Sequence, residues 1–113
     1  MKTLPQSRFP ILLWMLGLRW RIRVTGASML PLLKEGEILL YNPRAYRHRS
    51  PQIDDIVVAR HPISGIEIVK RVRDVREDGR VDLRGDNIGP SEDSRHYGPV
   101  DPGLILGRVT GYF

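Results

Sequence analysis

The chain has 113 residues, and its 18 Lys and Arg against 13 Asp and Glu give a formal net charge of +5 at pH 7. This length suits one domain spanning residues 1–113, because half of it would bury too little apolar surface to be stable alone. The absence of Cys excludes disulfide scaffolds, thiolate zinc sites, iron–sulfur clusters and cysteine nucleophiles.

The N-terminal segment combines apolar and basic residues. Residues 9–18 (FPILLWMLGL) form an apolar run between Arg8 and Arg19. The run is too short to cross a bilayer, which takes about 20 residues, and no small-residue cleavage site of a signal peptide follows it. It is expected either as a short helix docked on the protein or as a segment in the lipid interface, with peripheral membrane contact through residues 8–24. The expected location is cytoplasmic or peripherally membrane-associated, without a full transmembrane helix.

Beyond residue 19 the pattern is typical of short β-strands. Trp20, Ile22 and Val24 alternate with Arg21 and Arg23, the period of a strand with one buried face. Similar patterns and turn signals predict further strands, over residues 37–41, 55–60, 66–76, 80–84 and 104–113, with a long loop at 85–103. The prediction is a mainly β fold, a small coiled antiparallel sheet or partly closed barrel with a short N-terminal helix. Residues 1–19 would be the apolar segment and 20–113 the β core.

One basic residue is expected to point inward. On the strand at 66–76 the face that alternation assigns to the core carries Ile66, Ile68, Lys70 and Val72. A fully buried lysine can lose about 3–5 units from its usual pKa of about 10.4, so that an uncharged amine becomes available as a general base near pH 7. A lysine that extends past the isoleucines to the surface would explain the pattern equally well.

A candidate nucleophile lies directly after the first strand. Ser28 sits among small residues in Gly26-Ala27-Ser28-Met29-Leu30-Pro31. A serine nucleophile needs a base within hydrogen-bond reach. The three histidines fall in loops or turns with no Ser-His-Asp spacing, whereas a Ser–Lys dyad is a known alternative. Taken alone, Ser28 is better explained as an ordinary turn residue.

Three ordered motifs resemble those of signal peptidase I and related serine peptidases of the S26 type. Ser28-Met29-Leu30-Pro31 is similar to their nucleophile motif S-M-x-P, and Lys70-Arg71 after an apolar run is similar to their lysine motif. Gly85-Asp86-Asn87 followed by the stretch from Ser91 to Gly98 resembles their third motif, G-D-N…S-x-D-S-R-x-Y/W-G. Each motif alone is weak, but the order and the internal spacing agree in all three over residues 24–100.

The resemblance implies a role for each matching residue. Ser28 would attack the scissile carbonyl and its backbone N–H would help to form the oxyanion hole, beside Gly26 and Ala27. Lys70 would accept the serine proton and later deliver it to the leaving amine. Ser91, at the position of the family's second serine, would orient the lysine amine. The remaining matches would shape the supporting loop: Gly85, Asp86, Asn87 and the ion-paired Asp93 and Arg95.

The chain also departs from bacterial signal peptidases. Gly26 stands where a serine often donates to the oxyanion, so main-chain donors, or less directly Thr25, would have to suffice. Only fourteen residues separate Lys70 from Gly85, too few for the large second domain of the bacterial enzymes. This compactness resembles the small maturation proteases of nickel-type superoxide dismutase, which implies a superoxide dismutase precursor as one candidate substrate.

The predicted function is therefore a serine endopeptidase that removes an N-terminal leader or signal peptide from a precursor protein, without a metal or cofactor. The alternative is a non-enzymatic basic β-barrel that binds nucleic acid or an anionic membrane surface, since residues 1–50 carry nine basic and two acidic side chains. Aromatic residues are scarce and not interleaved with the basic ones, so a nucleic-acid partner is not expected. A peptidase would bury Lys70 near Ser28, whereas a nucleic-acid binder would expose it.

Overall fold

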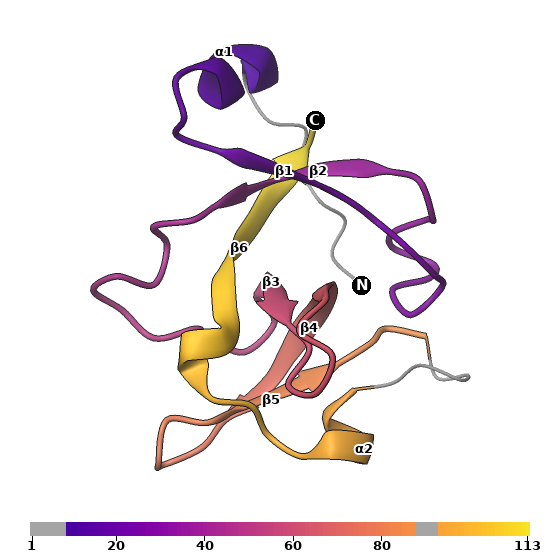
Figure 1. The fold of residues 1–113 in the computed structure, drawn as a ribbon, viewed down its shortest axis with the longest axis vertical. Coiled ribbons are helices and arrows are strands. Elements are labelled where there is room, and N and C mark those ends of the chain that lie inside the picture. The colour runs from indigo at the N-terminus through magenta and orange to yellow at the C-terminus, as the bar shows by residue number, and fades with distance from the viewer. Residues whose placement is uncertain (1–8, 88–92) are drawn as a thin grey trace.

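The computed structural model describes residues 9–87 and 93–113 (Figure 1). Within these residues the fold is a six-stranded antiparallel sheet with three short helical segments. The elements in chain order are α1 (Pro10–Met15), β1 (Trp20–Arg23), β2 (Ile38–Asn42), β3 (Ile56–Arg60), β4 (Glu67–Val75), β5 (Val81–Arg84), α2 (Ser94–Tyr97), the 3-10 helix η1 (Pro102–Leu104) and β6 (Ile105–Tyr112).

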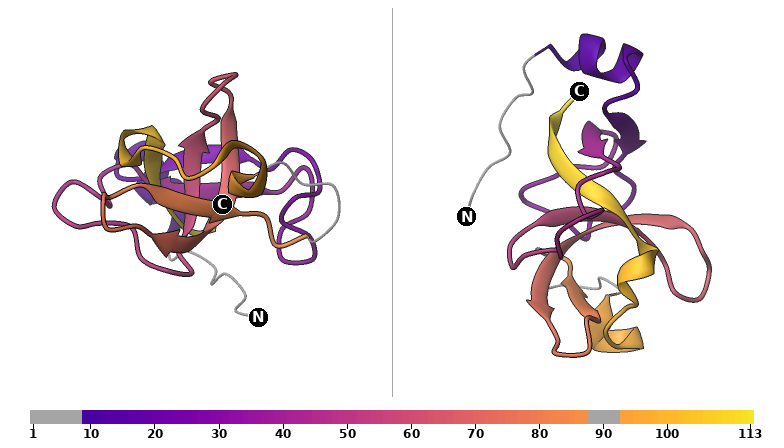
Figure 2. Two further views of the ribbon diagram at one scale, coloured as in Figure 1. Left: turned by 90° about the horizontal axis from the view of Figure 1, so that it is seen from below. Right: turned by 90° about the vertical axis from the view of Figure 1, so that its left-hand side faces the viewer.

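The sheet is open and strongly coiled. Its strand order is β1-β2-β6-β3-β4-β5, so β1 and β5 are the two edges among the described residues. In Figures 1 and 2 the long strand β6 runs from the end of the molecule that carries α2 towards the end that carries α1. The prediction of a mainly β antiparallel fold with a short N-terminal helix is confirmed, in the form of a coiled sheet that does not close.

Coiling gives the sheet an apolar core on each face. Along β3, Ile56 and Val58 belong to one cluster of buried residues, while Val57 and Ala59 belong to a second cluster. All four side chains are buried, because alternate residues of a strand point to opposite faces and both faces are covered here. The usual sign of a half-exposed strand, polar residues alternating with apolar ones, is therefore absent from β3.

The described part of residues 85–103, predicted as a loop, includes α2 and the first two residues of η1. The four-residue helix α2 begins after Asp93, whose carboxylate accepts a hydrogen bond from the Arg95 backbone N–H at 3.0 Å. η1 begins in the same way after Asp101, whose side chain accepts from the Gly103 N–H at 2.7 Å. Helices this short have no apolar periodicity of their own, so the sequence pattern shows only the glycines and prolines around them.

The apolar N-terminal run forms α1, which has no buried residue. Trp14 attaches it to the sheet through an edge-to-face contact with Phe113, with ring centroids 5.9 Å apart, and through the Arg21 guanidinium at 4.2 Å from its ring. Ile11 and Met15 remain largely exposed to solvent. Among the described residues no helix is long and apolar enough to span a membrane.

Candidate active site

The loop that carries Ser28 continues directly from the edge strand β1. Val24 extends the pairing with the segment before β2, donating its N–H to the Glu37 carbonyl and accepting from the Gly36 N–H, both at 2.8 Å. Gly26 then adopts φ +76°, a left-handed conformation that favours glycine, and turns the chain out of the strand. Beyond Ser28, the buried side chain of Met29 anchors the loop in the core. Ser28 itself is half-buried.

Lys70 lies on β4, directly opposite Val57 of β3. Paired residues of an antiparallel ladder point to the same face, so Lys70 shares the face of Val57 and Val72, both of which are fully buried. The side chain is only 4% exposed, as the alternation predicted. Two neighbours differ from the same pattern. Ile66 precedes β4 and is exposed, whereas Val69, on the opposite face, is buried because that face also carries a core.

Ser28 and Lys70 lie at the same pocket. It encloses about 310 Å³ and is lined by Ser28 and Lys70 together. One wall is formed by residues 22–29, from β1 and the loop that follows, and the other by residues 66–70, from the start of β4. His61 and Asn87 complete the lining. The fold therefore brings the serine and the lysine of two separate motifs to one cavity.

Asn87 joins the third motif to the serine loop. Its backbone N–H donates to the Ser28 carbonyl at 2.8 Å, and its side-chain amide donates to the Ala27 carbonyl at 2.9 Å. The preceding residue, Asp86, forms a two-pronged ion pair with Arg71 at 2.8 and 2.9 Å. Hydrogen bonding to Asp86 raises the pKa of Arg71, which stabilises the charge on this largely buried guanidinium. Because Arg71 follows Lys70, the ion pair ties the asparagine to the lysine strand.

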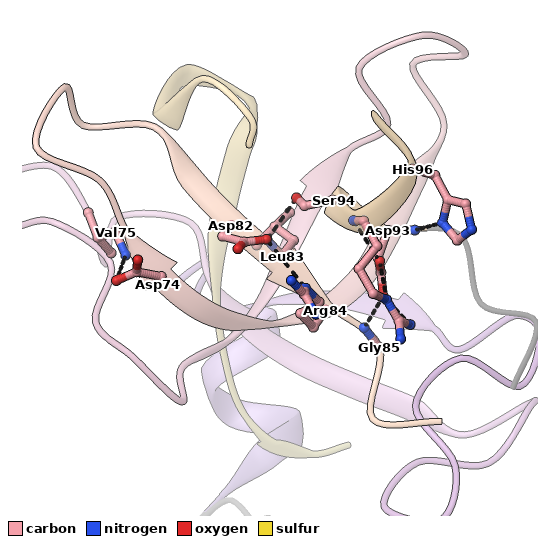
Figure 3. A network of polar contacts seen from close by, with 10 residues as sticks. Asp74, Val75, Asp82, Leu83, Arg84, Gly85, Asp93, Ser94 and His96 are labelled. Carbon is pink, nitrogen blue, oxygen red and sulfur yellow. Dashed lines mark hydrogen bonds and ion pairs between the residues drawn. The ribbon is translucent and has the colours of Figure 1, made fainter. Parts of the chain in front are cut away.

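Asp93, at the start of α2 (Figure 3), forms with Arg95 the ion pair that the resemblance implies. The Asp93 carboxylate is fully buried and accepts from the Gly85 N–H at 3.0 Å and from two nitrogens of the Arg95 guanidinium at 2.9 and 2.8 Å. Burial raises the pKa of Asp93, but the hydrogen bonds from Arg95 and Gly85 outweigh it and lower the pKa to about 2. The adjacent Ser94 hydroxyl accepts from the Leu83 N–H at 2.9 Å, so α2 is attached to β5.

The comparison with protein families decides the affiliation of the chain. Residues 9–75 match the model of the family described as signal peptidase, peptidase S26. The chain belongs to this family. The match covers the serine and lysine motifs, and the third motif lies beyond it. The S26 resemblance of the sequence is thereby confirmed.

Several mitochondrial inner membrane protease subunits are similar in sequence to most of the chain. It is 33% identical over 105 residues to mitochondrial inner membrane protease subunit 1 of Xenopus tropicalis, covering 75% of this chain and 63% of the relative. It is 36% identical over 107 residues to mitochondrial ATP-independent inner membrane protease subunit 1b of Arabidopsis thaliana, covering 74% and 63%. The chain thus spans less than two thirds of these relatives' lengths.

The S26 motif residues fall into three groups. Those that line the pocket are Gly26, Ala27, Ser28, Lys70 and Asn87. Gly85, Asp86, Asp93 and Arg95 do not line the pocket. They make polar contacts next to it in sequence, Asp86 with Arg71 and Asp93 with Gly85 and Arg95. Ser91, expected to orient the lysine, lies outside the described residues, so its role stays a prediction.

The pocket residues that were not identified from the sequence include two polar residues of the β3–β4 hairpin. His61, in the turn between β3 and β4, and Glu67, at the start of β4, line the cavity together with the motif residues. Their only sequence signal is their position at the predicted β3–β4 hairpin. That signal does not place them in the pocket, because the coiling of the sheet determines which strand edge faces the serine loop.

Proposed function

We propose that this chain is a serine endopeptidase in which Ser28 is the nucleophile and Lys70 the general base. The proposal rests on one observation above all: the two side chains, from separate motifs of an S26 family member, line one pocket while Lys70 is almost completely buried. Burial among apolar side chains favours the uncharged amine, the form that a base requires. A nucleic-acid binder would instead expose this lysine.

The reaction would proceed through an acyl-enzyme. The Ser28 oxygen attacks the scissile carbonyl while Lys70 accepts its proton. The carbon–nitrogen bond then breaks, and the lysine delivers that proton to the leaving amine. A water molecule, deprotonated by the same amine, hydrolyses the ester and restores the serine. The proposed substrate is a precursor protein from which an N-terminal leader or signal peptide is removed.

An extended peptide fits between two open strand edges that line the pocket. Val24 uses both backbone groups towards residues 36–37. Successive residues of a strand direct their backbone groups to opposite sides, so Arg23 and Thr25 direct theirs away from β2. No described strand pairs with this side of β1.

The opposite wall offers a matching edge. Val72 exchanges backbone hydrogen bonds with residues 54–55, so Glu67 and Val69 direct their backbone groups away from β3 by the same alternation. β5 pairs with β4 only from Arg71 onward, which leaves this part of the edge open among the described strands. A substrate strand inserted here would gain backbone hydrogen bonds from both walls and bring its carbonyl to Ser28.

Mass spectrometry of precursor proteins incubated with the chain tests the proposal. The set should include a nickel superoxide dismutase precursor, the substrate that the compactness of the chain suggests. Ser28→Ala and Lys70→Met should each abolish cleavage while the exposed-site controls Ser64→Ala and Lys34→Met retain it. Full activity in Ser28→Ala or Lys70→Met would refute the dyad.

A second, non-enzymatic property has its own support. α1 and the start of β1 expose large apolar side chains, among them Phe9, Leu16 and Trp20, beside the exposed guanidinium groups of Arg21 and Arg23. Apolar side chains rimmed by arginines suit the interface of an anionic membrane. We therefore place the protein at a membrane surface, and the names of the relatives give no support to a cytoplasmic location.

Flotation with vesicles tests this surface. The wild-type chain should bind vesicles containing phosphatidylglycerol, and Leu16→Glu together with Trp20→Glu should weaken binding at least tenfold. Equal flotation of the double variant and the wild type would contradict the assignment, whether or not the chain is a peptidase.

A further inference from the structure

The peptide bond that precedes Ser28 is held at its carbonyl oxygen by two hydrogen-bond donors. The Ala27 carbonyl accepts hydrogen bonds from the Asn87 side-chain amide at 2.9 Å and from the Leu30 N–H at 3.1 Å. The Ser28 carbonyl accepts a third bond, from the Asn87 backbone N–H at 2.8 Å. One asparagine therefore contacts the backbone on both sides of the candidate nucleophile.

Peptide geometry converts this contact into a constraint on the Ser28 N–H. A trans peptide bond is planar, with its C=O and N–H directed to opposite sides. Fixing the Ala27 carbonyl therefore fixes the direction of the Ser28 N–H as well. No described residue accepts a hydrogen bond from that N–H, so it is available to a ligand. Two donors on the carbonyl also polarise the peptide and strengthen the N–H as a donor.

The residue two positions before the serine, Gly26, cannot donate a side-chain hydrogen bond to an oxyanion. Gly26 has no side-chain donor, and its φ of +76° is one that other residues adopt only with strain. Its N–H is directed to the Glu35 carboxylate, at a long 3.5 Å. Stabilisation of an oxyanion therefore depends more heavily on the orientation of the Ser28 N–H.

We propose that Asn87 is a positioning residue whose side-chain amide orients the Ser28 N–H as the oxyanion donor. The inference rests on the proposed peptidase function and deepens it. The Asp86–Arg71 ion pair holds the preceding residue, so removal of the Asn87 amide leaves the anchor of this segment in place. The backbone hydrogen bond from residue 87 to the Ser28 carbonyl also survives side-chain substitution.

The effect should appear in the transition state rather than in substrate binding. Loss of a whole oxyanion donor lowers the rate by about 10²–10³, so a donor that is present but poorly aimed should cost about 10–100-fold in kcat. Asn87→Ala should show this loss with KM changed less than about threefold. Asn87→Asp should lose at least as much, because a carboxylate replaces the donor beside the Ala27 carbonyl. Asn42→Ala removes an asparagine cap of the loop after β2, outside the pocket lining, and should keep wild-type kcat.

A peptide aldehyde separates orientation from general loss of structure. It forms a tetrahedral adduct with Ser28 that places an oxyanion at the donor, whereas the corresponding peptide alcohol, which carries CH2OH in place of the aldehyde, forms no adduct and carries no charged oxygen. Asn87→Ala should weaken the aldehyde by the same factor as kcat/KM and leave the affinity for the alcohol unchanged. Rates are normalised to the active fraction, titrated with a serine-reactive phosphonate.

Three results would overturn the inference. They are a kcat per active site within twofold of wild type, an aldehyde affinity that is unchanged while kcat falls, and equal loss for the aldehyde and the alcohol. Failure of the proposed function itself would give a different result. The wild-type chain would then form no adduct with the aldehyde or the phosphonate, or Ser28→Ala would still cleave.

Discussion

Replacement of Asp93 by Asn tests how much the buried charge of Asp93 stabilises the segment that joins β5 to α2. This fully buried carboxylate accepts hydrogen bonds from the Gly85 N–H, the Arg95 N–H and the Arg95 guanidinium (Figure 3). Asn preserves the shape but removes the charge and turns a donor towards these donors. The variant should be less stable because the segment from β5 to α2 loses the group on which its polar contacts converge.

The lowered pKa of Asp93 gives the size of the effect. The pKa falls from 3.8 to about 2 as the hydrogen bonds from Arg95 and Gly85 outweigh the opposing effect of burial. At 1.36 kcal/mol per unit, ionised Asp93 stabilises the folded state by about 2 kcal/mol at neutral pH. A depressed pKa means that this stabilisation is present above about pH 4 and disappears as the pH falls towards 2. By the same linkage relation, about half of it should remain near pH 3.

Urea unfolding of wild type and Asp93→Asn at pH 7, 5 and 3 measures this difference. The free energies of unfolding should differ by about 2 kcal/mol at pH 7 and 5 and by about half as much at pH 3. Asp78→Asn is the matched control, because the Asp78–Arg80 ion pair is exposed and its loss should leave unfolding unchanged. A difference that is absent at pH 7, or the same at all three pH values, would refute the reasoning.

The remaining predictions concern the core, the sheet and the lysine. Leu39→Ala should lower the free energy of unfolding by about 2–5 kcal/mol in urea titrations, because Leu39 is fully buried. Gly107→Ala should cost about 3 kcal/mol in the same assay, since a Cβ would overlap the Asn42 carbonyl oxygen across the β2–β6 ladder; wild-type stability would contradict that contact. Lys70→Arg should not cleave peptides, because arginine stays charged. Wild-type cleavage rates should fall in acid as the lysine amine takes up a proton, and a flat profile down to pH 5 would count against the base assignment.

The local pattern of apolar and polar residues predicted much of the secondary structure. Short alternating or apolar runs bounded by turn residues predicted all six strands within one residue of their observed bounds, because these patterns are properties of neighbouring residues. Alternation assigned Lys70 to the expected core face with Ile68 and Val72. It was wrong for Ile66, which lies outside β4 and is exposed. α2 and η1 were missed because helices of four and three residues show no apolar periodicity of their own.

By itself the sequence determined the strands, the strand face that Lys70 shares with Ile68 and Val72, and the order of three motifs, because these depend on residues close together in the chain. Tertiary structure alone decided that Ser28 and Lys70 share a pocket, that Lys70 is buried, and that Asn87 bonds a loop 60 positions away. The physical reason is that strand order and coiling determine which edges meet. These depend on packing between residues distant in sequence, which no local period encodes.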